Sequence, residues 1–209
     1  MKRGTFITLE GGEGSGKSTL IGALAVELEK RGIQTLTTRE PGGTPLAEAV
    51  RELALYPPHD QSWSPLAHAL LMNTAREDHL RRKIAPALNQ GYWVLCDRFA
   101  DSTRAYQSID GVEMSVLHGL ETAVVGQSQP DLTLILDGAP QDLLKRREDR
   151  GVSDAFEDKE LAFHHKVREA FLQIAQDEPD RCVVLNALSS QEQVLDAALE
   201  AIQTRFDLK

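Results

Sequence analysis

The chain has 209 residues, of which 32 are acidic and 23 are lysine or arginine, so its formal net charge is −9. This length fits one compact domain, and the charge argues against a nucleic-acid polymer as partner, because binding along a polyanion requires a basic surface. No apolar run is long enough to cross a membrane and the N-terminus lacks the apolar stretch of a signal peptide, so we expect a cytoplasmic protein with no membrane partner.

Strand-like and helix-like segments alternate from the N-terminus. Residues 5–10 predict a first strand, and a glycine-rich loop follows it. Leucines at helical spacing predict a helix at 17–32, which Gly32 ends, and residues 33–40 predict a second strand.

Two start signals of the same kind come next. Thr44-Pro45 predicts a capped helix that Pro57-Pro58 stops, and Ser64-Pro65 predicts a long helix that reaches about Asn89. In each pair the hydroxyl side chain can accept a backbone N–H, and proline suits the first helical position.

The second half continues the alternation. The run at 92–97 is almost wholly apolar, as in a strand that is buried on both faces. Ser189 followed by Glu192 predicts a capping box at the start of the last helix. The other expected elements are helices at 101–108 and 113–126 and strands at 131–137 and 181–186.

This order predicts an α/β fold: a doubly wound parallel sheet flanked by helices, in a single domain over residues 1–209. Such sheets bind ligands beyond the carboxyl ends of their strands. Three predicted strands end at Glu10, Asp97-Arg98 and Asp137, so we expect these residues at one edge of the sheet.

Cysteine and histidine give no sign of a metal site. Cys96 and Cys182 lie far apart in strand-like runs, which predicts buried, reduced thiols. The adjacent His164 and His165 would point in different directions on a helix. We therefore assign no histidine to a metal.

The segment Gly11-x4-Gly16-Lys17-Ser18 is a complete Walker A pattern between a predicted strand and a predicted helix. Its glycines let backbone N–H groups surround phosphates, Lys17 would reach the β and γ phosphates, and the Ser18 hydroxyl would ligate Mg²⁺. The motif predicts a bound nucleoside triphosphate with Mg²⁺ but does not separate a kinase from a GTPase or a motor ATPase. The expected ATP-binding residues are Gly11, Gly12, Glu13, Gly14, Ser15, Gly16, Lys17, Ser18 and Thr19.

Arginines occur at several loop-like positions, and no guanine-reading motif of the NKxD type is present. The planar guanidinium group suits phosphate oxygens. Arg39 and Arg98 stand out because each directly follows a predicted strand at the binding edge.

Four segments together resemble the bacterial thymidylate kinases: EGGEGSGKST (10–19), TREPGGT (38–44), CDRFADSTRAYQ (96–107) and PDLTLILD (130–137). The resemblance covers essentially the whole chain. It implies a P-loop kinase that transfers the γ-phosphoryl group of ATP to dTMP, giving dTDP for dTTP synthesis, with Mg²⁺. It also implies a homodimer, for which the helices at 64–89 or 113–126 are the candidate surfaces.

On the acceptor side, the resemblance implies that Arg98 and Arg39 hold the dTMP phosphate and that Arg51 is a second clamp. Asp97 would orient Mg²⁺ through water. Glu13 would face the acceptor sugar.

For the nucleoside, the resemblance implies that Arg76 reads a thymine carbonyl and that Thr103 and Gln107 complete recognition of the base. Tyr106 would lie beneath the deoxyribose and exclude a ribose 2′-hydroxyl. Met72 stands where many relatives have a phenylalanine that stacks on thymine.

A basic segment at about 146–157 is the expected mobile lid, with Arg150 first and Arg146 second as the arginines that stabilise the transferred group. Gly14 stands where some relatives carry an arginine in the P-loop, and Ala155 stands where relatives commonly have a lid arginine. Two alternatives remain open at this point. The chain could be a P-loop kinase for another nucleotide, or a nucleotide-binding regulatory module.

Overall fold

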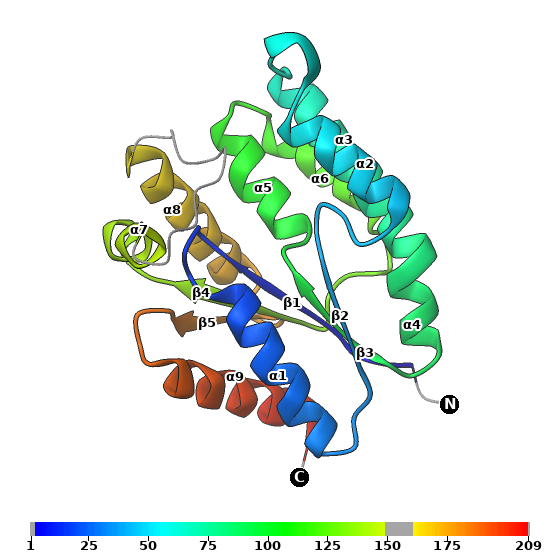
Figure 1. Cartoon of the computed structure of the whole chain (residues 1–209), viewed down its shortest axis with the longest axis vertical. Helices are drawn as coiled ribbons and strands as arrows, with labels where there is room; N and C mark the ends of the chain where they lie inside the picture. The colour runs from blue at the N-terminus through cyan, green and yellow to red at the C-terminus, as the bar shows by residue number, and fades with distance from the viewer. Residues whose placement is uncertain (1–2, 149–160, 209) are drawn as a thin grey trace.

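A computed structural model describes residues 3–148 and 161–208. Within these residues, five parallel strands form one sheet in the order β2-β3-β1-β4-β5 (Figure 1). The strands are β1 (Phe6–Gly11), β2 (Thr35–Arg39), β3 (Trp93–Asp97), β4 (Leu132–Asp137) and β5 (Cys182–Asn186). This confirms the doubly wound α/β fold.

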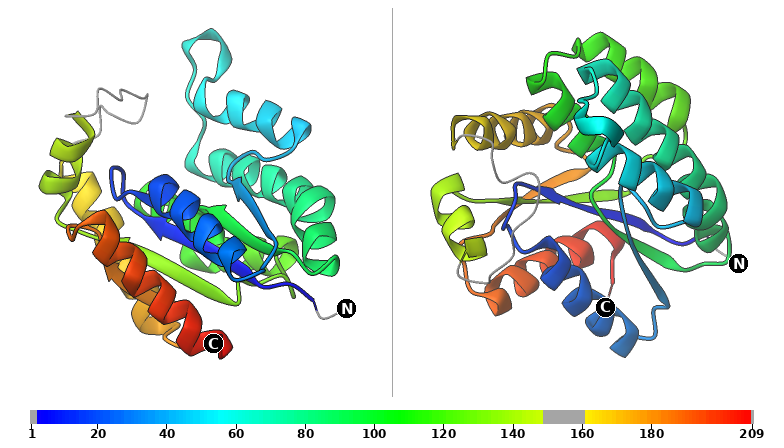
Figure 2. Two further views of the ribbon diagram at one scale, coloured as in Figure 1. Left: turned by 60° about the horizontal axis from the view of Figure 1, so that its bottom comes forward. Right: turned by 45° about the horizontal axis from the view of Figure 1, so that its top comes forward.

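Helices cover both faces of the sheet (Figure 2). On one face, α1 (Lys17–Lys30) and α9 (Gln191–Phe206) pack on alternate strand residues such as Ile7, Leu9 and Leu134. The opposite face carries α4 (Ala85–Asn89), α5 (Ala100–Ile109) and α8 (Leu161–Asp177). The remaining α-helices are α2 (Pro45–Leu55), α3 (Pro65–His79), α6 (Met114–Val124) and α7 (Pro140–Glu148), and a short 3₁₀ helix, η1 (Pro58–Asp60), follows α2.

The start signals at Thr44 and Ser64 are confirmed. Each side chain accepts the backbone N–H three residues on, from Ala47 and Ala67 respectively, and a proline follows each cap. Cys96 and Cys182 are free and buried, as predicted. In the described part of the chain, no helix is long and apolar enough to span a membrane.

The long helix expected up to Asn89 is not a regular α-helix throughout. A π-helical stretch, η2 (Leu80–Ile84), separates α3 from α4. Pro86 explains the widened turn, because proline donates no N–H and its ring crowds the carbonyl four residues earlier.

The capping box of the last helix lies one residue later than predicted. Ser190, not Ser189, accepts the N–H of Gln193, and Gln193 accepts the N–H of Ser190 in return. Both serines are followed three residues later by Glu or Gln, so the pattern alone does not fix which one caps. The turn after β5 decides: Ser189 donates its N–H to the carbonyl of Asn186, within that turn.

Candidate active site

The glycine-rich loop joins the end of β1 to α1. Lys17 folds back into this loop, where its Nζ donates to Gly11 O at 3.1 Å, Gly12 O at 2.9 Å and Ser15 Oγ at 3.2 Å. A Cβ at Gly11 would lie 2.4 Å from the carbonyl oxygen of Leu136, so only glycine fits there. Burial, and then the charge of Arg98, lower the pKa of Lys17 to about 8. The loop thus holds a partly desolvated cation beside its own N–H groups.

Ser18 and Asp97 are the residues whose contact suits a metal ion. The Ser18 hydroxyl donates to Asp97 Oδ2 at 2.7 Å, across the edge where β1 and β3 end. No group of three or more His, Cys, Asp or Glu side chains in the described residues could hold a metal alone. One hydroxyl and one carboxylate suit Mg²⁺, which prefers oxygen ligands and takes the rest from water and phosphate.

A cavity of about 270 Å³ opens beside this edge, between the loop after β2, α3 and α5. It brings together all nine residues expected to bind dTMP, which come from five separate parts of the chain. The nine are Glu13, Arg39, Arg51, Met72, Arg76, Arg98, Thr103, Tyr106 and Gln107. Glu40, His68, Phe99 and Ser102 also line it and were not expected there.

Arg98 lies at the junction of the cavity and the P-loop. Its backbone adopts a φ of +66°, which is unusual for a residue other than glycine. Its guanidinium donates to Glu13 Oε1 at 2.5 Å and to Gly11 O and Ser102 Oγ at 3.1 Å each. It also lies 5.2 Å from the centre of the Tyr106 ring. The acceptor cavity and the phosphate loop therefore share this one cation.

Arg39 and Arg51 approach the cavity from the β2 side. Arg39 donates to both carboxylate oxygens of Glu48, at 3.1 and 2.9 Å, and about half of its side chain is exposed. Arg51 donates to the carbonyl of Pro41 at 3.0 Å. Both hydrogen bonds of Arg39 to Glu48 come from Nη2, so a phosphate in the cavity could be met by Nε or Nη1.

Comparison with known proteins gives one answer. The family model described as Thymidylate kinase matches residues 9–198. The chain is 49% identical to a thymidylate kinase of Caulobacter vibrioides over the full length of both, and 48% identical to one of Bradyrhizobium sp., covering 98% of this chain and 92% of that protein. A crystal structure of thymidylate kinase from Ehrlichia chaffeensis superposes with a TM-score of 0.78 at 33% identity, covering 96% of this chain and 100% of that one. The chain belongs to the thymidylate kinase family.

Within this thymidylate kinase fold, Arg76 is buried and held by protein groups on most sides. Its Nε donates to Glu40 at 2.8 Å, its Nη1 to Asn73 at 3.2 Å, and its Nη2 to Phe99 O at 3.0 Å and Thr103 Oγ1 at 2.9 Å. The sequence motifs predicted Arg76 and Thr103 as site residues but not Glu40. Glu40 and Arg76 form an ion pair although they are 36 positions apart in sequence.

Glu10, at the end of β1, holds the start of α5 next to the acceptor cavity. Its carboxylate accepts the N–H of Phe99 at 2.7 Å, the N–H of Ser102 at 3.3 Å and the hydroxyl of Ser102 at 2.6 Å. It therefore caps the N-terminus of α5, which carries Thr103, Tyr106 and Gln107. Burial, and then the charge of Asp101, raise the pKa of Glu10 to about 7.

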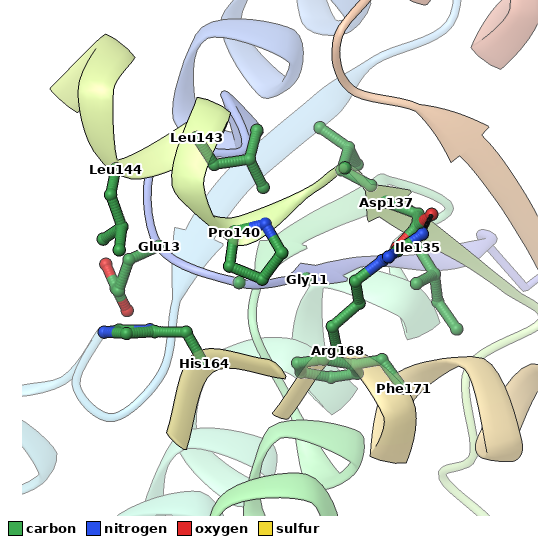
Figure 3. A pocket seen from close by; sticks show the side chains of 13 residues that line it. Gly11, Glu13, Ile135, Asp137, Pro140, Leu143, Leu144, His164, Arg168 and Phe171 are labelled. Carbon is green, nitrogen blue, oxygen red and sulfur yellow. Dashed lines mark hydrogen bonds and ion pairs between the residues drawn. The ribbon is translucent and has the colours of Figure 1, made fainter. Parts of the chain in front are cut away.

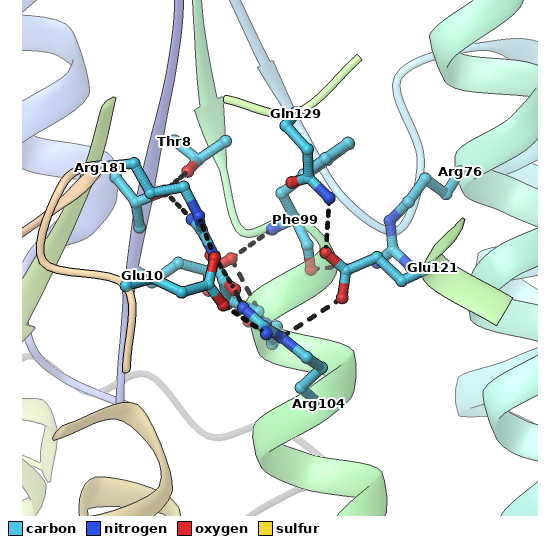
Figure 4. Close-up of polar contacts among 12 residues, drawn as sticks. Thr8, Glu10, Arg76, Phe99, Arg104, Glu121, Gln129 and Arg181 are labelled. Carbon is cyan, nitrogen blue, oxygen red and sulfur yellow. Dashed lines mark hydrogen bonds and ion pairs between the residues drawn. The ribbon is translucent and has the colours of Figure 1, made fainter. Parts of the chain in front are cut away.

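The buried far side of α5 is held by an ionic network (Figure 4). Asp101 accepts from Arg104 and from both terminal nitrogens of Arg181, which lie 2.8 Å away. Arg181 also donates to Thr133 of β4 at 2.7 Å, and Arg104 to Glu178 at 2.6 Å. These contacts fix α5 against the sheet.

The third strand end, Asp137, points to a different partner than the P-loop. Arg168 of α8 donates to both its carboxylate oxygens, at 2.7 and 2.9 Å. Both residues line a small cavity of about 20 Å³ under the P-loop, together with Glu13 and His164 (Figure 3). Asp137 thus lies at the expected edge but connects it to α8.

A cavity of about 620 Å³ lies on the other side of the P-loop, against α9. Gly14, Ser15, Gly16 and Thr19 line it, and so does the stretch 187–195, which sequence analysis did not assign to the site. Arg146 lines this cavity rather than the acceptor cavity, and donates at 2.7 Å to the carbonyls of Ala187 and Leu188. Arg150, Ala155 and most of the expected lid lie outside the described residues.

Proposed function

We propose that this protein transfers the γ-phosphoryl group of ATP to dTMP, giving dTDP and ADP for dTTP synthesis in the cytoplasm. The observation that carries the proposal is the shared wall of the two sites. Glu13 and Arg98 belong to the acceptor cavity, and Arg98 also contacts the P-loop carbonyl of Gly11. A phosphate of dTMP would therefore meet the terminal phosphate of ATP at this wall.

The donor occupies the P-loop, residues 11–19, with its nucleoside in the cavity against α9. Lys17 leaves its carbonyl partners to bind the β and γ phosphates. Ser18 and Asp97 would hold Mg²⁺, Asp97 through water, and the metal would neutralise charge on the phosphates.

The acceptor phosphate is held by Arg98, Arg39 and Arg51. Arg98 exchanges Glu13 for the phosphate, and the released Glu13 carboxylate then faces the sugar. A phosphate oxygen is already a competent nucleophile near neutral pH, so these residues align and neutralise the reacting groups and no strong base is required.

The base lies against Met72 on α3, with Tyr106 beneath the deoxyribose. The four hydrogen bonds of Arg76 to described residues use four of its five N–H groups, which leaves one on Nη1 for a thymine carbonyl. The Thr103 hydroxyl accepts from Arg76, so its own proton is free to turn toward the base, and Gln107 completes the set. A wrong base would leave buried polar groups unpaired.

Arg150 and then Arg146 are the arginines that we assign to the transferred group. The contacts of Arg146 with the loop after β5 would have to open for this role. We also propose a homodimer through the α3 and α6 side of the molecule, where several apolar side chains are exposed.

A coupled assay of ADP release tests the function. With ATP and Mg²⁺, we expect dTMP to be phosphorylated far better than dUMP, dCMP or UMP. Arg98→Ala should lower kcat/KM for dTMP by about 10²–10³-fold, the usual cost of one donor to a phosphoryl or oxyanion group. The control is Arg81→Ala, because Arg81 is an exposed arginine paired with Glu77 on the protein surface. ADP release that does not depend on dTMP would overturn the proposal and favour a regulatory nucleotide-binding module.

A further inference from the structure

Four polar side chains, of which three are buried and Thr38 is half-buried, form a hydrogen-bonded series behind the acceptor cavity. Thr38 Oγ1 lies 2.8 Å from Nε2 of His79, and Nδ1 of His79 lies 3.0 Å from Glu40 Oε1. The other oxygen of Glu40 accepts from Nε of Arg76 at 2.8 Å. His79, Glu40 and Arg76 are 0%, 4% and 3% exposed. These hydrogen-bonded side chains therefore link β2 to the guanidinium group of Arg76, which lines the cavity.

The direction of the central hydrogen bond follows from chemistry. A carboxylate that already accepts from Arg76 only accepts, so Nδ1 of His79 must carry a proton and donate it to Glu40. This contact fixes the plane of the Glu40 carboxylate. The second oxygen of the carboxylate then fixes Nε, and with it the plane of the Arg76 guanidinium.

The imidazole ring is confined by the backbone as well. A Cβ at Gly43 would lie 2.4 Å from Nε2 of His79 and 2.7 Å from Oγ1 of Thr38. The loop therefore passes directly over the ring, and Gly43 has a φ of +88° that favours glycine. His79 is also the last residue of α3 before the π-helical stretch, one turn from Arg76 on the same side. The helix is regular over the turn that carries both residues.

We propose that His79 is a positioning residue for recognition of the acceptor base. It acts through Glu40, which it orients so that Arg76 presents one N–H to the base. The inference rests on the proposed function, in which Arg76 reads a thymine carbonyl. The N–H at Nδ1 of His79 is the group that orients Glu40.

Two substitutions distinguish the hydrogen bond from His79 to Glu40 from a role of His79 in packing alone. His79→Asn keeps an amide N–H close to the position of Nδ1, whereas His79→Gln places its amide closer to the position of Nε2. We expect His79→Gln to raise the KM for dTMP roughly tenfold or more, the usual effect of losing a hydrogen bond to a charged group. The KM for ATP should stay within about twofold, and the preference for dTMP over dCMP should fall by a similar factor. His79→Asn should retain most of the affinity and selectivity.

Thermal unfolding and ATP binding are measured on each variant, so that a folding defect is not read as a loss of recognition. Thr38→Val gives an independent second test, since it removes the hydroxyl behind Nε2 with little change in volume. It should raise the KM for dTMP by a few fold and leave the KM for ATP unchanged. Equal loss in the Asn and Gln variants, or parallel changes in both KM values, would overturn the positioning role.

The failure of the proposed function gives a different result. In that case the unmodified protein shows no dTMP-dependent turnover, and both proposals fall together. If the unmodified protein prefers dTMP and His79→Gln has unchanged KM and selectivity, only the role of His79 is overturned.

Discussion

Glu10 is the residue on which the acceptor half of the site is built. It is fully buried, it follows directly from the core of β1, and it receives three hydrogen bonds from the start of α5. Burial raises the pKa of Glu10 from the ordinary 4.5 of a glutamate to about 7, and the charge of Asp101 adds to the rise, so the hydrogen bonds from Ser102 and Phe99 do not compensate in full. The raised pKa means that the ionised form of Glu10 is destabilised, because the carboxylate is buried where it accepts the N–H groups at the start of α5.

The pKa of Glu10 has a measurable effect on stability. The folded protein binds the proton more tightly than the unfolded chain, so the stabilising contribution is complete below about pH 4.5 and is lost as the pH rises through about 7. Glu10→Gln removes this titration and keeps an acceptor for the two N–H groups. From about pH 6 to pH 8, the unmodified protein should lose about 1 kcal/mol of unfolding free energy relative to this variant, as measured by urea denaturation.

The control is Glu77→Gln, because Glu77 is an exposed carboxylate on α3. Parallel curves for Glu10→Gln and the unmodified protein would show that Glu10 does not titrate in this way.

At the scale of elements, the sequence correctly predicted those helix starts that are set by residues a few positions apart. The helix starts at Thr44 and Ser64 were correct because the accepting hydroxyl, the proline and the donating N–H lie within four positions. The position of the last capping box was wrong by one residue, because two serines satisfied the same pattern. The π-helical stretch was not predicted either, although Pro86 is a signal that could have indicated it.

The two serines before α9 allow a direct test of this difference. Ser190→Ala should lower the unfolding free energy by about 1 kcal/mol, because it leaves the N–H of Gln193 without its side-chain acceptor. For a chain of this size that corresponds to about 2–4 °C in Tm. Ser189→Ala should leave Tm unchanged, since Ser189 takes part in the preceding turn through its backbone. The opposite ranking in differential scanning calorimetry would place the cap at Ser189, as the sequence pattern suggested.

The candidate site was predicted in the same uneven way. The P-loop and the strand ends could be located, because the motif is local and the carboxyl ends of parallel strands meet at one edge. The contacts that hold these groups in place were not predicted. Glu10 with Ser102, Glu40 with Arg76, and Arg146 with Ala187 are 92, 36 and 41 residues apart in sequence. No local pattern indicates such pairs, since only the folded sheet and helices bring them together.

At the scale of the whole molecule, the protein is acidic but its acceptor cavity is lined by arginines. The chain has a net charge of −9, yet Arg39, Arg51, Arg76 and Arg98 line one cavity. Each of them contacts a carboxylate or a backbone carbonyl, so none of these cations faces the cavity without a protein partner. Binding of a phosphate to Arg98 would exchange its contact with Glu13. The affinity for dTMP therefore depends on the difference between two sets of ionic contacts.

The other whole-molecule feature is the apolar surface on α2, α3 and α6, which pack side by side (Figure 1). Leu66 and Leu70 are one turn apart on α3 and each 47% exposed, and Val116 on α6 is 41% exposed. Apolar side chains gathered on adjacent helices are typical of a surface that is covered in an assembly. Because α3 also carries Met72 and Arg76, pairing through it would stabilise one wall of the acceptor cavity.

Sedimentation or light scattering tests the dimer directly. The unmodified protein should have twice the 23.1 kDa mass of one chain at micromolar concentration. Leu70→Arg should shift it to the monomer mass, because two buried cations would face each other or lose water without a partner. Val26→Arg is the matched control, since Val26 is 51% exposed on α1, which covers the other face of the sheet. If the unmodified protein has the mass of one chain, or if both variants keep the dimer mass, α3 does not form the interface. A dimer that only Leu70→Arg dissociates, with a higher KM for dTMP in the monomer, would connect assembly to the acceptor cavity through α3.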